Sequence, residues 1–157
     1  MEFSATERNA FGLVVKIELK GILTLASCII AKSRGEGLEK SSNSNDAKEG
    51  IKAFGLLFSN LLIGLCVFHV VLDEVQINFF VVKEEYRKKG FGSYLMSSLI
   101  KHCEKLNINK LLLEVSHTNV TAEKFYSRFD FCTVGIRRNY YKDGSDALLK
   151  EKKLTTK

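Results

Sequence analysis

One carboxylate interrupts one of the most apolar segments of the chain. Glu114 stands in the segment 110–115, and the two-residue period of a strand places it on the face opposite Leu111 and Leu113. A carboxylate in such a strand costs free energy unless it faces a cleft, a partner or solvent. Two interpretations are open: a general base that accepts a substrate proton, and a strand-end glutamate that reaches solvent.

Tyr126 is a second candidate for proton transfer. It follows on a predicted helix, on the same face as Ala122 and Phe129. A tyrosine hydroxyl can donate a proton to a leaving group, but a buried tyrosine more commonly serves as a core aromatic residue. Tyr140 and Tyr141 are expected to be exposed or half-buried strand aromatics.

A glycine-containing loop precedes another predicted helix. Its pattern, Arg87-x-x-Gly90-x-Gly92, brings backbone N–H groups and a helix N-terminus to one point, which suits a pyrophosphate. The pattern is not a Walker A loop, because no Lys-Ser or Lys-Thr follows Gly92. It is not a dinucleotide fingerprint either, because Leu95 occupies the third glycine position. A plain glycine start to a helix remains the alternative.

These candidates need strands and helices to position them. Apolar alternation and short apolar runs predict strands at 13–19, 54–58, 61–72, 75–82, 110–115, 131–138 and 147–154. Helical spacing predicts helices at 21–31, 93–106 and 120–128, and Asn119 is expected to cap the last of them. Because the strands come first as a meander and later alternate with helices, we expect a mixed sheet.

The composition is that of one ordinary globular domain. The chain has 157 residues, of which 45% are hydrophobic and 27% charged, with 11 Gly and no Pro. These values exclude collagen-like, mucin-like and coiled-coil architectures. We therefore expect a single domain over 1–157, with 1–12 as an N-terminal extension and the Ser- and Asn-rich segment 32–50 as a flexible loop.

Charge and cysteine usage narrow the classes of ligand. The 24 Lys and Arg against 18 Asp and Glu give a formal charge of +6, which favours polyanionic ligands but is spread along the chain. The four cysteines lie in apolar runs without a CxxC pair, so we expect core residues and no metal site: Cys28, Cys66, Cys103 and Cys132.

Two segments bear on localisation. The segment 1–20 lacks an uninterrupted apolar stretch, because Lys16, Glu18 and Lys20 break it, and we expect a cytoplasmic protein. The segment 53–72 carries no formal charge and is long enough to span a bilayer. Its central Ser-Asn pair and the β-branched residues that follow favour a β-hairpin instead.

The order of these features resembles the GNAT family of acetyl-CoA-dependent N-acetyltransferases. The features are the strand, the glycine loop, the helix, Glu114, Asn119, Tyr126 and the segment 135–141. VVLDE at 70–74, LEVSHTN at 113–119 and IRRNYYKDG at 136–144 are similar to the branch that acetylates the N-terminal alanine of a small-subunit ribosomal protein. The resemblance covers 50–157 well and 13–34 faintly. It implies an α/β (α+β) fold with a mixed, mostly antiparallel, splayed sheet of about six to seven strands and flanking helices.

The resemblance also implies a role for each candidate residue. Acetyl-CoA would be the cosubstrate, with no metal, held by Phe80, Val81, Val82, Arg87, Lys88, Lys89, Gly90, Phe91, Gly92 and Asn119. Glu114 would remove a proton from the substrate's α-ammonium, and Tyr126 would protonate the departing CoA thiolate. Tyr140 and Tyr141 would line the peptide's N-terminus.

The implied function is Nα-acetylation of a protein N-terminus, with the alanine-led ribosomal protein as substrate and no nucleic-acid or membrane ligand. Acetylation of a lysine side chain or small amine, and a degenerate acyl-CoA-binding module, stay open as alternatives. Three departures from the family pattern bear on this choice. Asp130 stands where relatives carry Gly, Glu84-Glu85 replaces Asp-Pro, and residues 12–53, which form one wall of the peptide groove in relatives, contain no aromatic residue.

Overall fold

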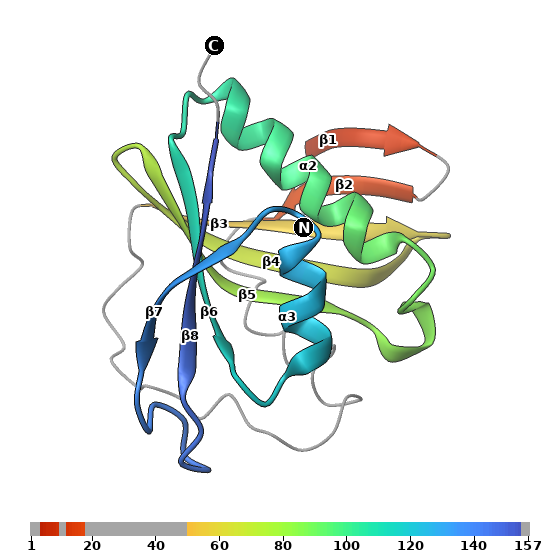
Figure 1. Cartoon of the computed structure of the whole chain (residues 1–157). Helices are drawn as coiled ribbons and strands as arrows, with labels where there is room; N and C mark the ends of the chain where they lie inside the picture. Colours follow the sequence, from red (N-terminus) through yellow and green to blue (C-terminus); the bar gives the residue numbers. More distant parts are fainter. Residues whose placement is uncertain (1–3, 10–11, 18–49, 155–157) are drawn as a thin grey trace, which may run out of the picture. The chain divides into compact units, whose positions relative to one another are not determined.

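The computed structural model describes residues 4–9, 12–17 and 50–154 (Figure 1). Along the chain the elements are β1 (Ser4–Asn9), β2 (Gly12–Ile17), β3 (Ile51–Phe58), β4 (Leu61–Val71), β5 (Glu74–Val82), the 3-10 helix η1 (Glu84–Tyr86), α2 (Phe91–Lys105), β6 (Lys110–Ser116), α3 (Val120–Ser127), β7 (Cys132–Arg137) and β8 (Ala147–Lys153). The helix expected at 21–31 and the loop expected at 32–50, apart from Gly50, lie outside the described residues.

The strands are hydrogen-bonded in the order β1-β2-β3-β4-β5-β6-β8-β7. The pairs β1–β2, β2–β3, β3–β4, β6–β8 and β7–β8 are antiparallel, whereas β5–β6 is parallel. The expected mixed, mostly antiparallel sheet is therefore confirmed. The described residues contain eight strands, more than the expected six to seven, because Ser4–Asn9 pairs with β2 inside the expected N-terminal extension.

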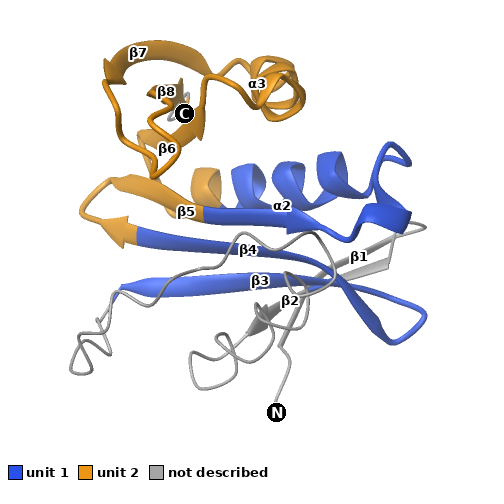
Figure 2. Cartoon of the chain, turned by 90° about the horizontal axis from the view of Figure 1, so that it is seen from below, with its two compact units in different colours: residues 1–69, 79–102 blue, residues 70–78, 103–157 orange. Residues whose placement is uncertain are grey.

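Two compact units divide the chain (Figure 2). Unit 1 comprises Met1–His69 and Phe79–His102, and unit 2 comprises Val70–Asn78 and Cys103–Lys157. Strand β5 begins in unit 2 and ends in unit 1, and α2 passes from unit 1 into unit 2 at its last turn.

The core of unit 1 is the hairpin formed by β3 and β4. Ser59 and Asn60 both have positive φ, 48° and 62°, as a two-residue hairpin turn with the right-handed strand twist requires. The rings of Phe54 and Phe68 meet edge to face at 5.3 Å and are fully buried. The uncharged segment 53–72 is thus a hairpin, as expected. Among the described residues, the helices are too short or too polar to cross a membrane.

Helix α2 packs on β4 at a glycine. Leu95, Met96 and Leu99 are fully buried along one face of the helix, at the helical spacing expected from the sequence. A Cβ added to Gly64 would lie 3.4 Å from Cδ2 of Leu95 and 3.3 Å from Cβ of Leu56, so a larger residue would force neighbours to shift. The helix lies along one face of β3 and β4 (Figure 1).

Unit 2 is organised around β6. Alternate residues of this strand are buried, with Leu111, Leu113 and Val115 on the apolar face. Helix α3 begins at the expected cap, because Oδ1 of Asn119 accepts a hydrogen bond from the Ala122 N–H at 3.1 Å. Helix α3 covers the apolar face of β6.

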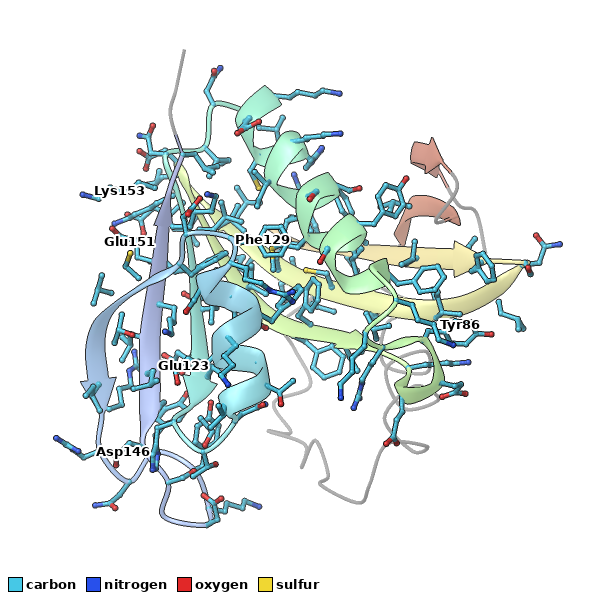
Figure 3. The ribbon with its side chains drawn as sticks, turned by 45° about the vertical axis from the view of Figure 1, so that its right-hand side comes forward. Tyr86, Glu123, Phe129, Asp146, Glu151 and Lys153 are labelled. Atoms are coloured by element: carbon cyan, nitrogen blue, oxygen red, sulfur yellow. The ribbon has the colours of Figure 1, made fainter. Side chains whose placement is uncertain are left out.

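An ion pair ties α3 to β8. Nζ of Lys150 lies 3.2 Å from Oε1 of Glu123, and the lysine side chain is only 3% exposed. Glu123 is labelled on the cyan helix in Figure 3. Lys150 stands opposite Leu113 in the β6–β8 register, so α3 covers the face of β6 that carries Leu113.

Two expectations about single residues need correction. Cys132 is exposed because β7 is an edge strand, whereas Cys66 and Cys103 are buried as expected and Cys28 lies outside the described residues. Tyr140 and Tyr141 are not strand residues, because β7 ends at Arg137.

Candidate active site

The candidate residues fall into two groups, one in each unit. Residues 80–92, expected to hold the cosubstrate, belong to unit 1. The other candidates, Glu114, Asn119, Tyr126, Tyr140 and Tyr141, belong to unit 2. Each group is described within its own unit.

The unit 1 loop has a defined backbone path. Nε of Arg87 donates a 2.8 Å hydrogen bond to the Val82 carbonyl, which closes the loop onto the end of β5. Lys88 and Gly90 have positive φ, 57° and 88°. The conformation at Gly90 strongly favours glycine, because a Cβ would strain it.

The N-terminus of α2 is available to an anion. The first helical bond runs from the Tyr94 N–H to the Gly90 carbonyl, at 3.0 Å. The N–H groups of the three residues 91–93 precede it, and the first N–H groups of a helix have no partner within the helix. They lie at the positive end of the helix dipole, and the first turn contains no acidic residue. This end of the helix can therefore bind a phosphate group.

Basic and aromatic side chains frame the same loop. Arg87, Lys88 and Lys89 are exposed, and Nζ of Lys89 donates to the Glu85 carbonyl at 2.8 Å. The Tyr86 ring, labelled beside the loop in Figure 3, lies 5.7 Å from the Phe91 ring. The loop thus combines a packed aromatic base with exposed positive charge, which suits a polyanion.

Phe80, Val81 and Val82 occupy the last part of β5. The register of β5 with β6 runs from Glu74 to Ile77, and these three residues follow it along the strand. Phe80 and Val81 are half-buried, and Val82 is buried. Residues 80–82 have the extended backbone that a ligand requires for strand-like hydrogen bonds.

In unit 2, Glu114 lies in a polar cluster. Its Oε1 is 3.2 Å from Nη1 of Arg137, and its side chain is 22% exposed. The Tyr140 hydroxyl donates a hydrogen bond to the Glu114 carboxylate, and this bond is the main reason that the pKa of Tyr140 is raised. The guanidinium of Arg137 lies 5.5 Å from the centre of the Tyr140 ring, within cation–π range.

Tyr141 completes this group, which we call the Glu114 cluster: Glu114, Arg137, Tyr140 and Tyr141. The two tyrosine rings meet edge to face at 5.2 Å. Burial is the main cause that raises the pKa of Tyr141, and the Glu114 carboxylate adds to it. Both pKa shifts favour the protonated phenol, and Tyr140 is the tyrosine that donates to the carboxylate.

A β-bulge puts Arg137 in this cluster. The β7–β8 register pairs Thr133 with Lys150, then shifts by one residue and pairs Gly135 with Leu149. Glu114 also pairs with Leu149, from the other side of β8, so Glu114, Leu149 and Gly135 share a face. Arg137, two residues after Gly135, shares this face as well.

The connection between β7 and β8 is held by Asp146. Its Oδ1 accepts from the Asn139 N–H at 2.9 Å, and its Oδ2 lies 2.7 Å from Nη1 of Arg138. The bond from the Asn139 N–H lowers the pKa of Asp146 most, and the bond from Arg138 lowers it further. The Asp146 N–H donates to Nδ1 of His117 at 3.1 Å. Asp146, labelled in Figure 3, thereby shapes the connection that presents the two tyrosines.

Tyr126 and Glu114 face different sides of the unit 2 strands. Glu114 stands on the face opposite Leu113, whereas α3 covers the face of Leu113. Tyr126 is 9% exposed and its ring lies 5.8 Å from that of Phe131. The structure brings Glu114 together with Tyr140 and Tyr141, while Tyr126 belongs to the aromatic packing of α3.

Asp130 adopts the left-handed backbone that glycine supplies in the related pattern. Its φ is 61°, and its Oδ2 lies 3.5 Å from Nζ of Lys152 on β8. Aspartate is among the residues that tolerate this conformation best. The turn after α3 therefore survives the replacement of glycine.

Sequence reasoning missed Arg137 as a member of the site. The signal available was its place in the segment 136–144, whose similarity to relatives drew attention to the tyrosines alone. Within the described part of the chain, no group of three or more His, Cys, Asp or Glu side chains could hold a metal ion.

Residues 29–131 match the Acetyltransferase (GNAT) family. A Bacillus subtilis protein described as a putative [ribosomal protein bS18]-alanine N-acetyltransferase is 38% identical over 89 residues, which cover 56% of this chain and 59% of that protein. The chain thus matches less than two thirds of that relative's length.

Two solved structures are also similar. The ribosomal-protein-S18-alanine N-acetyltransferase from Escherichia coli superposes with a TM-score of 0.76 at 26% identity, covering 92% of this chain and 94% of that one. The PaiA N-acetyltransferase from Thermoplasma acidophilum, in complex with coenzyme A, has a TM-score of 0.58 at 26% identity, covering 67% and 62%.

Proposed function

The chain belongs to the Acetyltransferase (GNAT) family, and we propose that it transfers an acetyl group from acetyl-CoA to the α-amine of a protein N-terminus. The observation that carries the proposal is the Glu114 cluster, in which a half-buried carboxylate on β6 stands beside two tyrosines. A carboxylate in this setting can accept a proton from an incoming amine.

The unit 1 loop fits the phosphates of acetyl-CoA. The first N–H groups of α2, the turn at Gly90 and three exposed basic side chains form a donor set for a pyrophosphate. Acetyl-CoA supplies an activated acetyl thioester. We assign to Phe80, Val81 and Val82 the backbone hydrogen bonds that hold the pantetheine arm and polarise the thioester carbonyl. Asn119 adds a further hydrogen bond in this proposal.

Glu114 acts as the base. An α-ammonium has a pKa of about 7.7 to 8.0, so a carboxylate is a strong enough base near neutral pH, directly or through one water. Because Glu114 is half-buried rather than sealed, an amine can approach it from solvent. Tyr140 and Tyr141 line the approach and contact the first residue of the peptide.

Tyr126 acts as the acid. The amine loses one proton to Glu114 before its lone pair forms the new N–C bond, and a second proton afterwards. As the C–S bond breaks, the CoA sulfur takes the proton of the Tyr126 hydroxyl, which is then restored from solvent. One proton is released to solvent for each acetyl group transferred.

For the substrate we propose the N-terminal alanine of a small-subunit ribosomal protein, acetylated in the cytoplasm. The support is the similarity to two relatives described as alanine N-acetyltransferases of a ribosomal protein, bS18 in one and S18 in the other. A lysine side chain and a small amine are the competing acceptors. A degenerate acyl-CoA-binding module is the competing non-enzymatic function. The proposal includes no nucleic-acid or membrane ligand.

The test is mass spectrometry of peptides incubated with the full chain and acetyl-CoA. The panel holds an alanine-led ribosomal sequence, its serine-led and methionine-led versions, and an N-blocked peptide with an internal lysine. We expect one added acetyl group on the free N-termini, fastest on the alanine-led peptide. Tyr126→Phe should retain acetyl-CoA binding, measured by calorimetry, and lose turnover.

Acetylation of the blocked peptide at an equal rate would move the protein to the lysine or small-amine class. Acetyl-CoA binding without any product would favour the degenerate module. Full turnover by Tyr126→Phe would remove the acid role from Tyr126 and leave the transferase activity standing.

A further inference from the structure

The proposed base is already paired with a cation of the same chain. The guanidinium of Arg137 lies 3.2 Å from the Glu114 carboxylate, and the Tyr140 hydroxyl donates to the same carboxylate. An amine that reaches Glu114 must therefore take its place beside a positive charge. The function proposed above uses Glu114 and leaves Arg137 without a role.

Two contacts hold Arg137 in place. Its guanidinium pairs with Glu114 and lies 5.5 Å from the centre of the Tyr140 ring. The side chain of Arg137 is 53% exposed, so solvent weakens the ion pair, but the cation–π contact keeps the charge beside the carboxylate. The ion pair and the cation–π contact together fix the position of the Arg137 guanidinium.

The bulge in β7 selects Arg137 from two adjacent arginines. With the shift between Thr133 and Gly135, Arg137 shares the face of Glu114, and Arg138 pairs with Asp146 instead. Without the shift, Arg138 would take the face of Glu114, because alternate strand residues face opposite sides. A β-bulge that changes which side chain reaches a site is a common functional device.

The groups that face Glu114 have distinct charges. Arg137 approaches from β7, Tyr140 and Tyr141 approach from the connection after it, and Leu149 stands opposite on β8. Arg137 supplies the positive charge in this set. A second cation brought to the same carboxylate is repelled by the guanidinium, which favours the neutral form of an amine.

We infer that Arg137 is an electrostatic positioning residue of the amine site, whose guanidinium beside Glu114 promotes loss of the proton from the bound amine. The cost of this loss differs between acceptors, because an α-ammonium has a pKa of about 7.7 to 8.0 and a lysine ε-ammonium one of about 10.4. Near neutral pH this loss is therefore less costly for an N-terminal α-amine than for a lysine side chain. This inference rests on the proposed function.

The test is the pH dependence of kcat with a saturating alanine-led peptide. In Arg137→Gln we expect the pKa that governs the acidic limb of the kcat profile, that of the bound amine, to rise by about 0.5 to 1 unit. A close cation can cause a larger shift, but this pair is half exposed and solvent weakens it. Turnover near neutral pH should fall about 3- to 10-fold and recover toward the wild-type value at alkaline pH. Arg137→Lys should restore most of the wild-type profile.

Arg138→Gln is the matched control. It removes the same charge from the next residue, whose partner is Asp146, and it should leave the pKa of the acidic limb unchanged. A second readout is one peptide that carries both amines: in Arg137→Gln acetylation near neutral pH should fall at both amines, whereas Arg138→Gln should change neither rate.

An Arg137→Gln profile that superposes on the wild type, or a loss of turnover equal at every pH, would overturn the inference. Glu114→Gln separates this failure from failure of the proposed function. If Glu114→Gln loses turnover while Arg137→Gln keeps the wild-type profile, the role of Arg137 alone is wrong. If Glu114→Gln retains full turnover, the base assignment falls first and the role of Arg137 falls with it.

Discussion

The unit 1 loop and the Glu114 cluster of unit 2 are built on different physical grounds. The loop relies on main-chain geometry, with N–H groups at the start of α2 and a left-handed glycine at position 90. The cluster relies on side chains that three strands and a connection bring to one face. Backbone recognition tolerates changes of side chain, whereas a side-chain cluster depends on register. Substitutions should therefore have different effects in the two regions.

The largest effect is expected at Glu114. Glu114→Gln keeps the shape of the side chain and removes the base, so kcat should fall on the order of 10² to 10⁴-fold. Acetyl-CoA affinity should stay at the wild-type value, because the phosphate site is the unit 1 loop. Steady-state kinetics and calorimetry measure the two quantities. Unchanged kcat would show that proton transfer does not pass through this carboxylate.

A moderate effect is expected when the loop backbone is changed. Gly90→Ala places a Cβ at φ 88°, which costs about 1 to 2 kcal/mol in the folded state. The KM for acetyl-CoA should rise about 10-fold, because the loop relieves this strain by leaving the conformation that directs its N–H groups, while the KM for peptide stays unchanged.

Gly144→Ala is the control for the strain itself. Gly144 has a φ of 79°, and an added Cβ would meet nothing within 4 Å, so the loss of folding stability should be similar. Its KM for acetyl-CoA should equal the wild-type value. An equal rise of that KM in both variants would mean that general destabilisation, and not the loop, is responsible.

A smaller effect is expected from the exposed lysines of the loop. Lys88→Gln and Lys89→Gln should each raise the KM for acetyl-CoA by about 2- to 5-fold, since exposed charge pairs are weak. The difference from wild type should shrink with added salt, because screening reduces the contribution of each lysine. A salt-independent difference would point to a specific hydrogen bond. Lys101→Gln, a change at an exposed position on α2, serves as the control.

The smallest effect is expected at Asp146. Its pKa is lowered by the Asn139 N–H and then by Arg138, so the folded state favours the carboxylate. The stability it contributes is present above the unfolded pKa of about 3.9 and is lost as the pH falls through the folded value. Asp146→Asn should lower the melting temperature at neutral pH, and the difference should close at acid pH. A gap that persists there would attribute the effect to shape rather than charge.

Most strands and helices of the described residues were predictable from local patterns. The hairpin turn at Ser59-Asn60, the buried face of α2 and the Asn119 cap each depend on a few neighbouring residues, and the structure confirms them. Strand β1 was missed, because Ser4–Asn9 is polar and gains its order from pairing with β2. The exposure of Cys132 was missed because edge position depends on strand order.

The candidate site was predictable in part. The glycine loop and the face of Glu114 on its strand follow from sequence spacing. The meeting of Glu114 with Arg137 does not, because it requires β8 to lie between β6 and β7 and the β7 register to shift by one residue.

By itself, the sequence determined the periodicity of each element, the glycine turn before α2 and the polar residue within β6. Each of these is a local property, set by backbone sterics and side-chain spacing over a few residues. The tertiary structure decided which distant side chains meet. A β-bulge turns Arg137 rather than Arg138 toward Glu114, and α3 places Tyr126 on the opposite face. Long-range strand pairing and register carry this information, and they depend on the packing of the whole chain.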